Sequence, residues 1–182
     1  ASALGLPDII SHLLSQGALP NACDAQGFNA LHCAAIHGFS SRDKQRVLAM
    51  FDMLLYAETE FDSATKSGQT PLHFLLGARA EAGASCDEDV LISALERLLS
   101  EGVDLDTQDH RGMSALHLAA MHGLSRIVNR LLREGANRNA RDSLGRTPHE
   151  LALARGFVDV AAEFETLRST QPSMARFLRD PN

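Results

Sequence analysis

The 182-residue chain lacks several features that mark common functional classes. It has no excess of positive charge, since 17 lysines and arginines face 23 acidic residues and give a formal net charge of −6. Nucleic-acid-binding domains normally show a basic surface, so this balance argues against direct nucleic-acid binding. No apolar run approaches the roughly 18 residues of a membrane-spanning helix, and no signal peptide is visible. We therefore expect neither nucleic acid nor membrane among the partners.

Cysteine is scarce as well, with Cys23, Cys33 and Cys86 the three copies. The number is odd and the spacing shows no pairs, which does not fit a disulfide framework. We interpret these residues as reduced, partly buried thiols. This usage favours an intracellular protein, cytoplasmic or nuclear.

What the chain does contain is a four-residue phrase that recurs along its length. The copies are Asn29–His32, Thr70–His73, Ser114–His117 and, in degraded form, Thr147–Glu150. Each copy lies two residues after a glycine, namely Gly27, Gly68, Gly112 and Gly145. Self-similarity of this kind indicates stacked structural units, which form extended surfaces more readily than catalytic pockets.

The clearest unit runs from Asp109 to Arg141 and predicts two helices. Ser114 can cap a first short helix of small apolar residues, which His122 and the following glycine end. Apolar residues at helical spacing from Ile127 to Leu132 predict a second helix. A glycine and an extended turn then lead to the next unit.

This pattern resembles the ankyrin repeat. The match recurs in register over about residues 3 to 168, because the second leucine of each Leu-Leu pair precedes the next motif glycine by the same distance. The resemblance implies an all-α solenoid of stacked helix-turn-helix units joined by β-hairpin-like turns, with about four to five repeats. The expected single domain covers 1–182, with repeats at 1–23 (truncated), 24–64, 65–108, 109–141 and 142–168, and a tail or cap at 169–182.

The first repeat contains only the second helix of its unit. By register its own four-residue phrase would lie before residue 1, which is not methionine. We therefore expect a fragment of a longer chain. In the tail, Met174, Phe177 and Leu178 form an apolar segment that is either a capping helix or the start of another element.

Repeats two and three depart from the regular length, because successive motif glycines lie 41, 44 and 33 residues apart. We expect the extra residues 39–46 to lengthen the second helix of repeat two, and a helix from about Glu88 to Leu99 to follow the insertion in repeat three. Arg79 replaces the glycine that ends the first helix elsewhere, so this helix is predicted to run on. Glu58 likewise stands where other repeats have glycine. The insertions are either neutral loop variation or a partner-specific extension of the surface.

Charge is segregated between neighbouring repeats. Nine acidic residues and one basic residue lie between Glu81 and Asp109, whereas eight arginines and three acidic residues lie between His110 and Arg155. The two segments either pair with each other across adjacent repeats or steer a partner of complementary charge.

The recurring histidines His32, His73 and His117 invite a metal hypothesis, which we reject because one histidine per repeat places them along the stack rather than around one ion. The ankyrin resemblance implies instead that each histidine hydrogen-bonds around its motif and to the neighbouring repeat. No metalloprotease, hydrolase or phosphate-loop motif occurs. We expect no catalytic residues, no metal and no cofactor, and we do not expect an enzyme.

The resemblance places partner contacts on the hairpin tips and on the concave row of first helices. Phe28, Ile36, Met113 and Met121 are apolar at positions that the fold does not need apolar, so they form either a binding stripe or packing against adjacent repeats. The expected partner-binding residues are Gln26, Phe28, Ile36, His37, Lys66, Gln69, His110, Arg111, Met113, Met121 and His122.

The expected function is that of a protein–protein interaction module, a monomeric segment that binds another protein. Two alternatives stay open. The segment is the targeting or scaffold domain of a larger enzyme or secreted effector, or it acts through its insertions like the ankyrin domains of transcription regulators.

Overall fold

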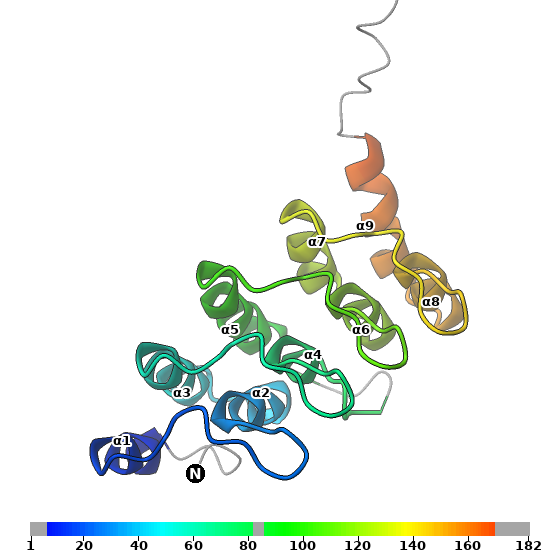
Figure 1. Ribbon diagram of the computed structural model, residues 1–182. Coiled ribbons are helices and arrows are strands. Elements are labelled where there is room, and N and C mark those ends of the chain that lie inside the picture. Colours follow the sequence, from blue (N-terminus) through cyan, green and yellow to red (C-terminus); the bar gives the residue numbers. More distant parts are fainter. Residues whose placement is uncertain (1–6, 82–85, 170–182) are drawn as a thin grey trace, which may run out of the picture.

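The computed structural model describes residues 7–81 and 86–169 and, within these ranges, consists of helices joined by turns without a strand (Figure 1). The helices are α1 (Pro7–Ser15), α2 (Ala30–Ser40), α3 (Lys44–Tyr56), α4 (Pro71–Leu75), α5 (Glu88–Ser100), α6 (Ala115–His122), α7 (Ser125–Arg133), α8 (Pro148–Ala154) and α9 (Val158–Ser169). The predicted apolar tail with Met174, Phe177 and Leu178 lies outside the described residues.

The helices form two parallel rows, as expected of a solenoid. The inner row contains α2, α4, α6 and α8, and the outer row contains α1, α3, α5, α7 and α9 (Figure 1). Each helix packs on its neighbour in the same row, and the turns between repeats project beyond the inner row. The prediction of an all-α stack of two-helix units is confirmed. Among the described helices, none combines the length and apolar character that a membrane crossing requires.

The recurring phrase starts each inner helix. Asn29 accepts a hydrogen bond from the His32 backbone N–H at 3.0 Å, and the Thr147 hydroxyl accepts one from the Glu150 N–H at 3.3 Å. Pro71 occupies the first turn of α4, where the missing N–H has no partner to lose. The helix starts therefore lie where the motif predicts them.

The third residue of α2, α4 and α6 is a histidine that links two repeats. Its Nδ1 accepts from the backbone N–H of the capping residue, and its Nε2 donates to a carbonyl of the next repeat. These interrepeat bonds join His32 to Gln69 (3.2 Å), His73 to Met113 (2.9 Å) and His117 to Arg146 (3.1 Å). Burial lowers the pKa of all three histidines, so the neutral form that makes both bonds is favoured.

The two insertions change the helices in different ways. In repeat two the extra residues lengthen both helices, because α2 has 11 residues and α3 has 13, against 8 and 9 in repeat four. In repeat three the predicted helix after the insertion is confirmed as α5. Glu58 adopts the left-handed conformation that glycine holds in the other repeats, with φ of 57°.

The predicted extension of α4 through Arg79 is wrong. The helix ends at Leu75 and the chain turns at Gly77, where φ is +85°. A Cβ atom at this position would lie 2.6 Å from the Phe39 ring and 2.7 Å from His122 Nε2. Only glycine fits this close approach, so α4 stops early. The insertion begins as a turn, in which the Ala80 N–H donates to the Gly77 carbonyl at 2.9 Å.

Charge segregation is explained in part by pairing between repeats three and four. Arg126 contacts Asp89 at 2.5 Å and Arg130 contacts Glu96 at 2.6 Å, with Arg130 also bound to Glu134 in its own repeat. The pairs are partly exposed, and each such pair contributes only about 0–1 kcal/mol. Both interrepeat pairs join α7 to α5.

Candidate functional site

The hairpin tips form one continuous edge beside the inner helices. A backbone N–H in each hairpin donates to a carbonyl of the preceding hairpin: Lys66 to Gln26 (2.9 Å), His110 to Ser67 (3.0 Å) and Ser143 to Arg111 (2.8 Å). The Gln69 side-chain amide also donates to the Asp109 carboxylate at 3.1 Å, across the boundary between repeats three and four. The tips are therefore held in fixed relative positions while their side chains remain at the surface.

The predicted contact residues divide into three groups by exposure. Those at the tips, namely Gln26, Lys66, His110 and Arg111, are exposed. Those on or beside the inner helices, namely Phe28, Ile36, His37, Gln69 and Met121, are half-buried. Met113 and His122 are buried, each 5% exposed.

The expectation that Met113 and His122 present surface to a partner is not met, and the fold explains why. The Met113 carbonyl accepts from His73 and its N–H donates to Asp109, so this residue closes the boundary between two repeats. His122 donates to the Gly77 carbonyl at 3.0 Å. The predicted apolar stripe is thereby interrupted: Met121 is half-buried in repeat four, and the longer accessible part, formed by Phe28 and Ile36, lies on repeat two.

An aromatic cluster marks this accessible part. The ring of Phe28 lies 5.1 Å from that of Phe74 and 5.6 Å from that of His32. The guanidinium carbon of Arg79 lies 4.6 Å from the Phe28 ring centroid, within cation–π range. The insertion of repeat three thus reaches back and covers part of repeat two.

Two adjoining hollows flank Arg79. The larger, of about 280 Å³, is lined by Asp24, Gln26, Phe28, Cys33, Ile36 and Arg79. The smaller, of about 170 Å³, lies between α2 and the segment after α4 and shares Ile36 and Arg79 with the larger. Hydrogen bonds from the backbone N–H groups of Phe28 and Gln26 lower the pKa of Asp24, so a carboxylate stands opposite the guanidinium. The surface suits an apolar side chain whose neighbours carry polar groups.

Arg79 was absent from the predicted contact residues. The prediction carried positions over from regular repeats, and an insertion has no counterpart there. A usable signal was Arg79 itself, the single cation in an otherwise acidic insertion at about residues 78–89.

Comparison with known proteins identifies the repeats. A family model described as ankyrin repeats in three copies matches residues 83–164. The mouse B-cell lymphoma 3 protein homolog is 29% identical over 178 residues, covering 85% of this chain and 39% of the relative. The chain belongs to the ankyrin-repeat family. Two further relatives of this ankyrin array are the chicken nuclear factor NF-kappa-B p105 subunit, at 29% identity over 157 residues, and human neurogenic locus notch homolog protein 1, at 33% over 156 residues.

The array corresponds to only a part of each of these proteins. It aligns over 85% of its own length in both of the last two cases, yet spans 14% of the p105 subunit and 5% of the notch homolog. Ankyrin repeats are in general protein–protein interaction modules.

Proposed function

We propose that this array is a non-catalytic module that binds another protein through its hairpin tips and concave inner face, centred on repeats two and three. The contact residues would be Phe28, Ile36 and Arg79 at the centre, with Gln26, His37, Lys66, Gln69, His110, Arg111 and Met121 around them. The observation that carries the proposal is the stack of Arg79 over Phe28 beside two hollows.

The chemistry of this cluster favours a protein partner. Aromatic residues and arginine are enriched in protein interfaces and supply most of their strongest contacts. Phe28 and Ile36 keep part of their apolar surface accessible although both pack against the core. A partner side chain that fills the hollows would remove this surface from water, and Arg79 would pair with an acidic or carbonyl group beside it.

The position of Arg79 favours a direct role for one insertion. One alternative expected from the sequence was a binding surface extended by the insertions. The position of Arg79 supports this alternative for the insertion in repeat three. The free thiols Cys23, Cys33 and Cys86 support an intracellular location within the same proposal. We likewise propose the repeat boundaries expected from the sequence. We also propose that the array serves as a targeting domain within a longer protein.

Affinity capture with matched variants tests the proposal. The purified array, an Ile36→Ser/Arg79→Glu variant and an Arg133→Glu control on the outer row are immobilised and exposed to extract from the source cells. Some proteins will be enriched by both the parent array and the control. We expect the double variant to capture at least tenfold less of each of them, since one interface anchor contributes about 1–4 kcal/mol. Binding is then repeated with purified proteins. An unchanged affinity of the folded double variant refutes the proposed surface.

A further inference from the structure

The hairpin tips carry positive charge although the chain as a whole is acidic. The net charge of the 182 residues is −6, but the tips, residues 25–28, 66–69, 110–113 and 143–146, contain no carboxylate. Lys66, Arg111 and Arg146 place a cation on each tip of repeats three, four and five. Lys66 and Arg111 are exposed, and Arg146 is half-buried. Most acidic residues of repeat three lie instead on α5 and in the turn after it.

Two of these cations have carboxylate partners that face inward. Arg111 Nε lies 3.3 Å from Asp109 Oδ2, and Arg146 Nη2 lies 2.7 Å from Asp142 Oδ2. Both carboxylate side chains are 1% exposed, whereas the two arginine side chains are 59% and 42% exposed. Each carboxylate also accepts backbone N–H groups of its own hairpin. The tips therefore present the guanidinium groups to the solvent and withdraw the acids from it.

Two further arginines extend the positive charge onto the inner face. Arg79 stacks on Phe28, and Arg155 follows α8 directly; both are exposed. Lys66, Arg79 and Arg155 form no ion pair with the described part of the chain. We call the set of five residues the cationic edge: Lys66, Arg79, Arg111, Arg146 and Arg155.

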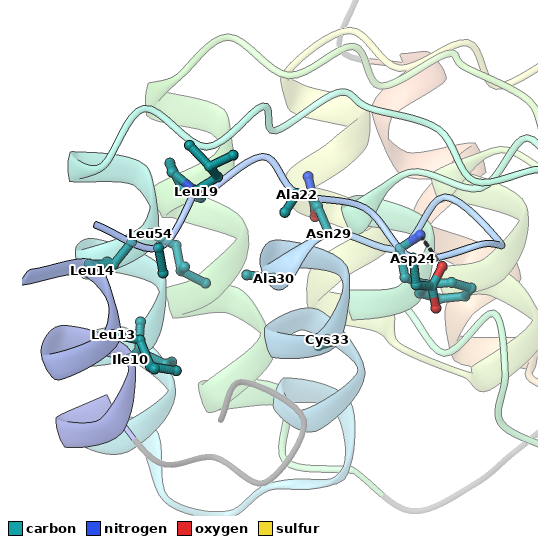
Figure 2. Close-up of a pocket in the computed structure, with 13 residues that line it drawn as sticks. Ile10, Leu13, Leu14, Leu19, Ala22, Asp24, Asn29, Ala30, Cys33 and Leu54 are labelled. Carbon is teal, nitrogen blue, oxygen red and sulfur yellow. Dashed lines mark hydrogen bonds between the residues drawn. The ribbon is translucent and has the colours of Figure 1, made fainter. Parts of the chain in front are cut away.

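Two exposed carboxylates lie in the same hairpins and inner helices, and each is bound to its own backbone. Asp24, at the base of the first tip, accepts from the Phe28 N–H at 2.9 Å (Figure 2). Glu150 in α8 accepts from the Thr147 N–H at 2.7 Å. Among the described residues, no ion pair joins either carboxylate to the cationic edge. The cations therefore remain available to an anionic partner.

We propose that the cationic edge binds an extended acidic segment of the partner protein, with acidic residues about three positions apart. This proposal rests on the proposed function, whose apolar anchor beside Arg79 holds one end of the segment. Packed helices lie about 8–10 Å apart, and an extended chain advances ~3.3 Å per residue. About three residues therefore span one repeat, so successive acidic side chains meet Lys66, Arg111 and Arg146.

Fluorescence anisotropy with labelled peptides tests the proposal. The probe has one leucine followed by glutamate at every third position, with glycine and serine between. One control peptide has glutamine for glutamate, and another has the same glutamates side by side. We expect the probe to bind most tightly at about 0.1 M salt and to lose its advantage near 1 M, where the Debye length falls from ~10 Å to ~3 Å. Equal binding of the three peptides, or none by any, overturns the proposal.

Matched charge reversals locate the binding. Lys66→Glu/Arg155→Glu removes two cations that have no ion pair to lose. Lys44→Glu/Arg133→Glu makes the same change of net charge at exposed positions on the outer helices α3 and α7. We expect the first variant to bind the probe about fivefold or more weakly, and the second to stay within about twofold of the parent. Equal losses would show attraction to the overall charge alone and would overturn the proposal.

Ile36→Ser separates this proposal from the proposed function. Unchanged probe binding by Ile36→Ser, with a loss in Lys66→Glu/Arg155→Glu, upholds the acidic segment and refutes the apolar anchor. A loss in Ile36→Ser alone upholds the anchor and overturns the acidic segment. A short single-stranded RNA with as many negative charges as the probe tests the other class of polyanion. Tighter binding of this RNA than of the probe, lost in Lys66→Glu/Arg155→Glu, would also overturn the proposal.

Discussion

Replacing His73 with alanine should remove a buried hydrogen-bonded link between repeats three and four. The ring is 1% exposed, its Nε2 donates to the Met113 carbonyl at 2.9 Å, and its Nδ1 receives the Thr70 hydroxyl at 2.9 Å and the Thr70 N–H at 3.2 Å. Three hydrogen bonds at about 1 kcal/mol each, with a buried carbonyl left without its donor, give a loss of about 3–5 kcal/mol. This is a large share of the ~5–15 kcal/mol that stabilises a typical domain.

Urea unfolding followed by circular dichroism measures this loss. Solenoid stability is approximately a sum of repeat and neighbour terms, so weakening one boundary should also broaden the transition or split it in two. His12→Ala is the matched control, because His12 is exposed on α1 and its replacement should change stability by no more than ~0.5 kcal/mol. A loss below about 1 kcal/mol for His73→Ala, with one sharp transition, would refute the assigned role.

Two further predictions concern the same core. Burial holds the pKa of the three repeat histidines below the ordinary value of about 6.5, so the unfolded chain binds more protons than the folded one as the pH falls below that value. The free energy of unfolding should therefore decrease from pH 7.5 to pH 5.5, by at most about 1.4 kcal/mol per histidine per pH unit, and equal stability at both pH values would contradict it. Gly77→Ala should lower the free energy of unfolding, measured in urea, by at least ~2 kcal/mol more than Gly102→Ala does. Both residues have positive φ, but of the two only Gly77 would bring an added Cβ within 4 Å of other atoms. Similar losses for the two variants would show that the close approach is unimportant.

The regular part of the fold was predictable because each residue of the recurring phrase has one structural task. Thr147 caps, Pro71 starts a helix, and His73 and His117 bridge to the next repeat, so the phrase locates inner helices wherever it occurs. Each of these tasks involves neighbouring residues or the adjacent repeat. The position of a residue within the phrase is therefore enough to predict its role.

The binding surface was less predictable because exposure depends on what the neighbouring repeat places opposite. Met113 looked like a free apolar residue, yet its backbone closes a repeat boundary. Arg79 looked like part of a longer helix, yet the contact of Gly77 with Phe39 ends that helix and turns Arg79 onto Phe28. The bond to the Met113 carbonyl recurs in register at the other repeat boundaries, at Gln69 and Arg146, whereas the position of Arg79 depends on an insertion that the regular unit lacks.

Site-specific photo-crosslinking tests the central claim most directly. A benzophenone amino acid replaces Ile36, in the hollow beside Arg79, or Tyr56, which is 92% exposed at the end of the outer helix α3. Each variant is irradiated in the source cells, and the crosslinked proteins are identified. The proposed function predicts a discrete crosslinked partner from position 36 that position 56 does not capture. Crosslinks from position 56 with none from position 36 would contradict it.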